Sequence, residues 1–159
     1  MSENQKQDSY SITPGSIILL LLPLLGLFAA SLPHALPDFD AGEFAMVGVN
    51  GGIPHPPGYP LFSMGLIAAV SIGKSLGINH IGVMSLFSSL CAVGAAALLY
   101  IALAEYCHSK TAAAIGIYAV FIASPVWRAA TAIEPFAINL FMASLCILSC
   151  WKILTTVNE

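Results

Sequence analysis

Residues 81–106 read IGVMSLFSSLCAVGAAALLYIALAEY and form the longest apolar stretch of the chain. About 20 consecutive apolar residues suffice for a helix that crosses the hydrocarbon core of a bilayer, so this stretch predicts a transmembrane helix. Its small residues suit the close contacts that helices make in lipid; they are Ser88, Ser89, Ala92, Gly94, Ala95 and Ala96. We therefore expect an integral membrane protein.

The composition of the whole chain agrees with this expectation. Hydrophobic residues make up 58% of the sequence and charged residues 8%, with a mean hydropathy of +0.87, whereas soluble domains carry about 25% charged residues. The deficit of charge extends along nearly the whole length, which disfavours a soluble domain tethered by one helix. Only residues 1–15 resemble an aqueous segment, and we expect them to form a cytoplasmic tail. The lipid bilayer is then the main partner, and the net charge of -3 excludes nucleic acid.

Working outward from the central stretch, three further apolar stretches predict spans, at residues 16–36, 111–127 and 136–154. A cleaved signal peptide is the alternative for residues 16–36, because Ala29 and Ser31 are small residues of the kind found at cleavage sites. The last stretch ends with Trp151 and Lys152, a pair typical of the membrane interface. Together with the central stretch, these segments give four transmembrane helices.

Residues 59–76 decide how the chain crosses the membrane. They are apolar for only about 15 residues, a length found in interfacial and re-entrant segments as well as in spans. Counting them as a span gives five helices, and leaving them out gives four. The positive-inside rule favours neither topology, since each places three basic residues inside and two outside.

The acidic residues favour four spans over five. Four spans leave Asp40 and Glu134 on the same face of the membrane, where one aqueous pocket can hold both, and carboxylates at bilayer depth are costly. We therefore expect an all-α, polytopic membrane domain over residues 16–155, with about four spans. One or two interfacial helices are expected in an external loop over residues 37–80.

This external loop begins with PDFDAGEFAMVGVNGGIPHPPGYPLF, residues 37–62, which gathers scarce ionisable groups. Asp38, Asp40 and Glu43 lie within six positions, and His55 follows between two prolines. A residue before proline is pushed toward extended conformations, so His55 is expected on a stiff loop near the acids.

Asp40 and Glu43 have two compatible interpretations. As a capping pair, the aspartate would accept from the first-turn amides of a helix over residues 41–49, and the glutamate would reach back. As a functional pair, the aspartate would act as a base. A metal site from His55 with Asp38 or Asp40 is a weak signal, because one histidine and scattered carboxylates lack the spacing of a zinc site. We predict no metal site and leave the cofactor open.

A second group of ionisable residues follows the third predicted span, in SPVWRAATAIEPF, residues 124–136. Arg128 suits phosphate by bidentate hydrogen bonding, or its charge could snorkel to the lipid head groups. Glu134 begins an apolar helix just before Pro135, where a carboxylate also interacts favourably with the helix dipole.

Three motifs in this order, FDAGEFA, GIPHPPGYPLF and SPVWRAATAIEPFAIN, resemble the N-terminal part of a multi-pass membrane family. That family includes a eukaryotic endoplasmic-reticulum protein O-mannosyltransferase and many uncharacterised bacterial proteins, and it belongs to the GT-C superfamily of lipid-donor glycosyltransferases. The resemblance covers about residues 16–145. In the superfamily, an acid in the first external loop acts on the acceptor or helps to hold a metal, and a second acid follows the third helix near the donor phosphate. By position, Asp40 matches the first acid and Glu134 the second.

The chain departs from the family pattern at both acidic motifs. Family members usually read Asp-Ser-Gly-Glu where residues 40–43 are DAGE, and Glu-Val-Tyr-Ala-Leu-Asn where residues 134–139 are EPFAIN. The second difference removes a tyrosine hydroxyl and a backbone N–H from the expected donor site.

The resemblance implies a membrane glycosyltransferase that transfers a sugar from a polyprenyl-phosphate donor to an acceptor on the external face. It implies catalytic roles for Asp40 and Glu43; the substrate-binding residues would be His55, Tyr59, Arg128 and Glu134. The alternative is a non-catalytic membrane scaffold or lipid-binding subunit. Superfamily members have more helices, so we expect the N-terminal fragment of a longer protein, completed by its remaining helices or by a partner subunit. The expected location is the bacterial inner (plasma) membrane.

Overall fold

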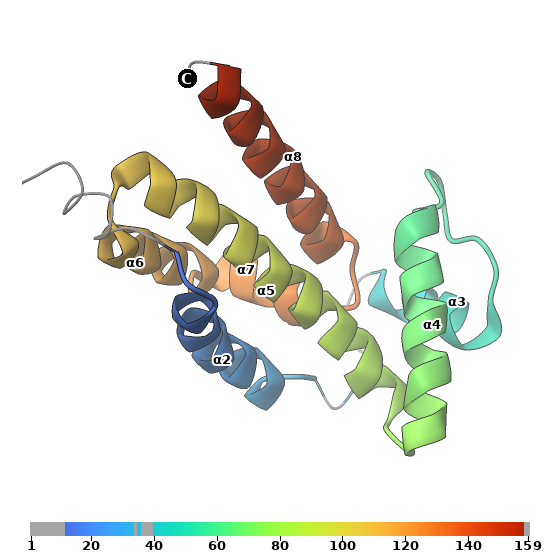
Figure 1. Cartoon of the computed structure of the whole chain (residues 1–159). Helices are drawn as coiled ribbons and strands as arrows, with labels where there is room; N and C mark the ends of the chain where they lie inside the picture. The colour runs from blue at the N-terminus through green and yellow to red at the C-terminus, as the bar shows by residue number, and fades with distance from the viewer. Residues whose placement is uncertain (1–11, 34, 36–39, 158–159) are drawn as a thin grey trace, which may run out of the picture.

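The computed structural model describes residues 12–33, 35 and 40–157, and these residues form helices joined by short connections (Figure 1). The described ranges contain no β-strand, which confirms the all-α class. The helices are α2 (Pro14–Ala30), α3 (Ala41–Asn50), α4 (Pro60–Leu76), α5 (His80–Cys107), α6 (Lys110–Phe121), α7 (Ser124–Thr131) and α8 (Phe136–Val157). Most of the expected cytoplasmic tail and Asp38 lie outside the described residues.

Helix α5 is the centre of the fold, since it contacts each of the other six described helices. Its buried face carries mainly small residues, which lets neighbouring helices approach closely. At Gly94, an added Cβ atom would lie 2.8 Å from the ring of Phe141 on α8. The absence of a side chain at this position therefore brings α8 directly against α5.

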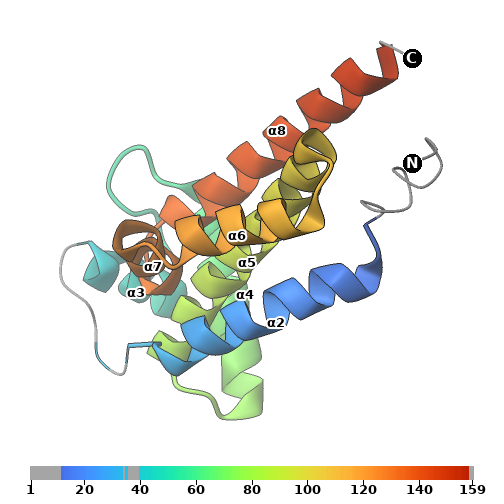
Figure 2. The same ribbon diagram turned by 90° about the vertical axis from the view of Figure 1, so that its left-hand side faces the viewer.

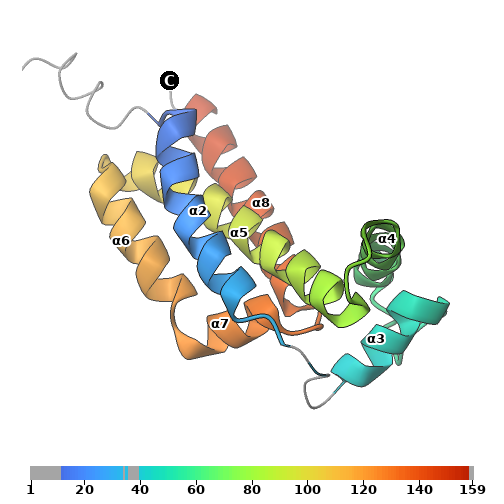
Figure 3. The same cartoon turned by 90° about the horizontal axis from the view of Figure 1, so that it is seen from below.

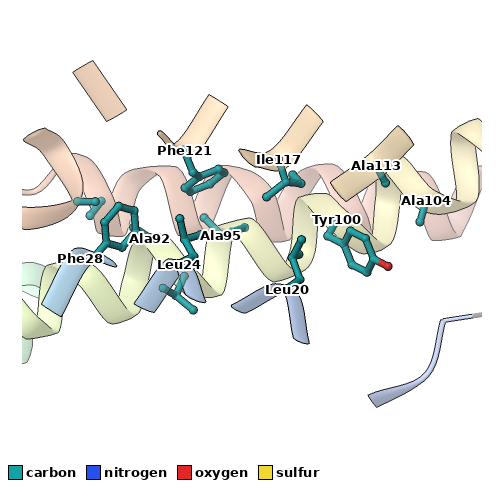
Figure 4. Close-up of a cluster of buried hydrophobic side chains, with 14 residues drawn as sticks. Leu20, Leu24, Phe28, Ala92, Ala95, Tyr100, Ala104, Ala113, Ile117 and Phe121 are labelled. Carbon is teal, nitrogen blue, oxygen red and sulfur yellow. The ribbon is translucent and has the colours of Figure 1, made fainter. Parts of the chain in front are cut away.

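The larger of the two buried clusters joins α2, α5 and α6 (Figure 4). Leu24 and Phe28 of α2 pack with Phe121 of α6 over the alanines of α5, and all are fully buried. The Tyr118 hydroxyl donates a 2.8 Å hydrogen bond to the Leu20 carbonyl, which also ties α6 to α2. Packing and interhelical hydrogen bonds of this kind are the main forces between helices in lipid.

The second cluster joins α3, α4 and the first half of α5. Phe44 and Phe62 meet edge to face, with ring centroids 5.3 Å apart. At Gly65, an added Cβ atom would lie only 2.3 Å from the ring of Phe87, so α4 rests directly on α5. This contact fixes the start of α4, where the loop after α3 ends.

The helices run in two main directions. Helices α2, α6 and α8 each run alongside α5, whereas α4 lies across them (Figures 1 and 3). The start of α2, the α5–α6 turn and the end of α8 lie at one end of this bundle (Figure 2). Helices α3 and α7 and the start of α8 lie at the opposite end, which brings the two acidic motifs to the same end.

Two helices in the described ranges, α5 and α8, are long and apolar enough to cross a membrane. Their bounds agree with the spans expected at residues 81–106 and 136–154. Helices α6 and α7 meet at a 73° bend, and they give a third span only if the bent pair is counted as one. Helices α2 and α4 are apolar, but each has 17 residues and is therefore shorter than the roughly 20 residues typical of a transmembrane helix. A count of four spans thus stays a prediction.

Two expected helices have different bounds in the structure. The helix expected over residues 111–127 stops at Phe121, because Pro125 has no N–H to donate and its ring would clash with the carbonyl four residues earlier. The helix expected over residues 16–36 ends at Ala30, where Ser31 caps it through the Leu27 and Phe28 carbonyls.

Candidate functional site

A pocket of about 730 Å³ opens at the end of the bundle that carries α3 and α7. Its walls come from the end of α2, the start of α3, the residue before α4, α7 with the loop that follows it, and the first turn of α8. The lining residues are Ser31, Pro33, Asp40, Phe44, Tyr59, Pro125, Arg128, Ala129, Thr131, Ala132, Glu134, Pro135, Phe136 and Asn139.

The pocket brings together four of the six residues that the sequence singled out, although they are far apart in the chain. These four are Asp40, Tyr59, Arg128 and Glu134. Glu43 and His55 are not among the described residues that line it. His55 lies beside Asp40, with Nε2 at 3.9 Å from Oδ2 of Asp40, and Glu43 contacts the other nitrogen of the same imidazole.

Asp40 directly precedes α3, and the helix expected over residues 41–49 is present. The capping prediction is nevertheless wrong, because the Asp40 side chain makes no capping hydrogen bond within the described residues. Its backbone has helical angles (φ -74°, ψ -6°), whereas an N-cap residue whose side chain caps a helix is typically extended. The carboxylate stays 65% exposed and faces the pocket.

Glu43 holds His55 through both of its carboxylate oxygens. Oε1 accepts a 2.6 Å hydrogen bond from the backbone N–H of His55, and Oε2 lies 2.8 Å from Nδ1 of the imidazole. An ionised carboxylate only accepts, so Nδ1 carries the proton in this bond. The bond raises the pKa of His55 above its usual value and lowers the pKa of Glu43. The other ring nitrogen, Nε2, lies 3.9 Å from Oδ2 of Asp40.

Aromatic contacts fix the same imidazole from the side. Ring centroids of Phe44 and Tyr59 each lie 5.7 Å from that of His55, and those two rings lie 5.5 Å apart. Tyr59 has φ 39° and ψ 55°, a left-handed conformation that is rare for a bulky residue. This backbone conformation starts α4 and leaves the tyrosine on the pocket wall.

Arg128 and Glu134 form the opposite wall. Helix α7, which carries Arg128, is anchored to α5 by a buried hydrogen bond of 2.9 Å from the Ser89 hydroxyl to the Ala130 carbonyl. Glu134 is partly buried in the loop between α7 and α8. Burial raises the pKa of its carboxyl, the charge of Asp40 raises it further, and Arg128 lowers it. The three charged groups therefore act on one another across the pocket.

Asp40, Glu43 and His55 are the only described group of three whose metal-ligand atoms all lie within 4.8 Å of one another. Both oxygens of Glu43 and the Nδ1 atom of His55 are already engaged with each other. We therefore treat the three side chains as an ionic and hydrogen-bonded network.

Sequence reasoning did not single out two prominent pocket residues, Phe44 and Asn139. Phe44 lies four positions after Asp40, so both reach the same side of the first turn of α3. Asn139 is an amide in an otherwise apolar segment near the start of α8, and this was a signal that could have marked it. Its side chain adds a donor and an acceptor to the wall that carries Arg128.

Comparison with known proteins finds similarity to the N-terminal domain of proteins that are named protein O-mannosyl-transferase. Residues 40–159 match the family model of the protein O-mannosyl-transferase TMEM260 N-terminal domain. A protein O-mannosyl-transferase tmem260 of Dictyostelium discoideum is 25% identical over 155 residues, which is 94% of this chain and 19% of that protein. The Mus musculus protein O-mannosyl-transferase TMEM260 is 27% identical over 133 residues, 83% of this chain and 19% of that protein.

The chain thus spans about a fifth of the length of the curated relatives that it matches. No solved structure matches it. The family match covers well over half of the chain and includes both acidic motifs and the loop between them. This chain belongs to the family of TMEM260 N-terminal domains.

Proposed function

We propose that this chain forms the catalytic pocket of a GT-C-type membrane glycosyltransferase. The enzyme would transfer a sugar from a polyprenyl-phosphate donor to an acceptor hydroxyl. The named relatives are protein O-mannosyl-transferases, so mannose and a protein hydroxyl are the sugar and acceptor that we propose first.

One observation carries this proposal: an exposed carboxylate and a guanidinium from distant segments line the same pocket at one end of an apolar bundle. In the reaction, the acceptor oxygen attacks the anomeric carbon while Asp40 takes the hydroxyl proton. The bond from the anomeric carbon to the phosphate oxygen breaks, and its electron pair leaves with the phosphate. Arg128 stabilises the departing phosphate by charge-assisted hydrogen bonds.

The other pocket residues have complementary roles in this proposal. Tyr59 and Glu134 would contact the sugar or the acceptor from the two walls. The pocket lies at the end of the helix bundle, so the polyprenyl chain of a bound donor would extend into the bilayer beside the helices. We propose four spans, with α4 along the outer interface and the pocket on the external face of a bacterial inner membrane. The remaining helices of a longer chain, or a partner subunit, would complete the enclosure.

The test uses the protein as its natural gene encodes it, reconstituted in vesicles with a radiolabelled mannosyl-phosphoryl-polyprenol and an acceptor peptide. Asp40→Asn should lower the transfer rate by about 10²-fold or more, since a neutral amide cannot take the proton. Arg128→Gln should lower it as well. Lys74→Gln, in the last turn of α4 and outside the pocket, is the matched control and should leave transfer unchanged. Unchanged transfer in both pocket variants would favour the scaffold alternative.

A further inference from the structure

We propose that His55 is a proton relay behind Asp40 and that Glu43 is the positioning residue that holds this relay in place. The proposal rests on the function proposed above, because it concerns the fate of the proton that Asp40 removes. It assigns to His55 and Glu43 roles outside the substrate pocket, since neither is among the described residues that line it.

The orientation of the imidazole is fixed from several directions. Glu43 accepts from both the backbone N–H and Nδ1 of His55, so one carboxylate fixes the main chain and the ring together. Phe44 and Tyr59 contact the ring from the side. Because Nδ1 is held by Glu43, the ring can present only Nε2 to Asp40, and Nε2 lies 3.9 Å from Oδ2.

The hydrogen bond to Glu43 also selects the tautomer. With the proton on Nδ1, a neutral imidazole has its lone pair on Nε2, directed at Asp40. The 3.9 Å separation is longer than a hydrogen bond, but the Asp40 side chain is 65% exposed and can rotate, or one water can bridge the two atoms. A proton on Asp40 can therefore reach the basic Nε2 atom of His55 after a side-chain rotation or through one bridging water.

Asp40 takes the acceptor's proton during attack on the anomeric carbon and becomes a neutral carboxylic acid. The proton then passes from Oδ2 to Nε2 of neutral His55, which regenerates the Asp40 carboxylate and forms an imidazolium. The imidazolium lies between two carboxylates, those of Glu43 and Asp40, which stabilise its charge. The side chain of His55 is 38% exposed, so the proton can pass on to water.

This relay predicts the direction of the pH dependence. Among the described residues, the charged or titratable groups beside His55 are Glu43 and Asp40 from the start of α3 and Tyr59 from the residue before α4. Glu134 and Arg128 line the pocket that Asp40 also lines. The relay requires neutral His55, so transfer should decline as pH falls through the His55 pKa. The Glu43 bond raises that pKa, so the acidic limb of the rate profile should lie at higher pH than it would for an imidazole without this carboxylate.

The experiment measures the pH profile of sugar transfer for the wild type, Glu43→Gln and His55→Gln in the natural full-length protein. Glu43→Gln keeps one of the two acceptor oxygens and removes the charge, so it should move the acidic limb to lower pH. His55→Gln should abolish this limb and lower the plateau by about 10²-fold. His80→Gln, at the first residue of α5 and outside the pocket, is the histidine control and should keep the wild-type profile.

A second measurement does not depend on turnover. Nitrogen-15 NMR of His55 in micelles should show the Nδ1-protonated tautomer in the wild type and a lower pKa in Glu43→Gln. If Glu43→Gln lowers the plateau without moving the limb, Glu43 has only a structural role and the relay is wrong. If Asp40→Asn abolishes transfer while His55→Gln retains the acidic limb, the relay fails but the proposed function stands. If the wild type transfers no sugar under any condition, both proposals fail.

Discussion

Replacing Gly65 by alanine should loosen the contact between α4 and α5. The new Cβ atom would lie 2.3 Å from Cζ of Phe87, whereas ordinary van der Waals contact begins near 3.4 Å. The Phe87 ring cannot retreat freely, because it packs against Phe62 at a centroid distance of 6.1 Å. Overpacking of this kind costs about 1–3 kcal/mol.

The matched control is the same substitution at Gly26, a mid-helix position of α2 where an added Cβ atom meets nothing within 4 Å. Alanine is favoured over glycine in both helices by about 1 kcal/mol, and this gain cancels when the two variants are compared. Gly65→Ala should therefore be less stable than Gly26→Ala by about 1–3 kcal/mol. Equilibrium unfolding in mixed micelles, followed by circular dichroism, measures this difference. Equal stabilities would show that α4 does not rest on Phe87.

Three further predictions concern the charged groups at opposite ends of the bundle. Arg128→Gln should raise the pKa of Glu134 further, because Arg128 lowers this pKa in the wild type. The control Lys74→Gln should leave the pKa of Glu134 unchanged. Infrared titration of the carboxyl group measures the pKa in each variant. The pKa of Glu134 is raised in the folded protein, so this residue stabilises the fold at low pH and loses the contribution as pH rises through that pKa. Glu134→Gln should remove this pH dependence of the free energy of unfolding. At the other end, Glu105 accepts from Trp151 Nε1 at 3.0 Å, so a Glu105→Ala and Trp151→Phe double-mutant cycle should give a coupling of about 0.6 kcal/mol.

The positions of the long helices could be predicted from the sequence because lipid imposes a simple requirement. Every backbone group in the hydrocarbon core must be paired within a helix, so apolar length alone gave the bounds of α5 and α8 closely. The break at Phe121 was less visible, since residues 111–127 are almost uniformly apolar. There a single proline outweighs hydropathy and turns the chain by 73°.

The site was predictable as a set of residues but not in its detailed contacts. Scarce charges in an apolar chain marked Asp40, Glu43 and Glu134. The choice of partner for Glu43 was not visible, because capping of α3 and binding of His55 satisfy the same local pattern. The structure has the second arrangement, since a carboxylate that bonds both the backbone and the ring of His55 gains two donors rather than one.

The most direct test of the central claim asks whether α3 and α7 face the same compartment. In a background without the four native cysteines, single cysteines replace Met46 on α3, Ser124 at the start of α7 and Thr111 at the start of α6, all exposed positions. Labelling of sealed vesicles with a membrane-impermeant maleimide should modify positions 46 and 124 from the same side and position 111 from the other. Modification of positions 46 and 124 from opposite sides would contradict a shared pocket for Asp40 and Arg128.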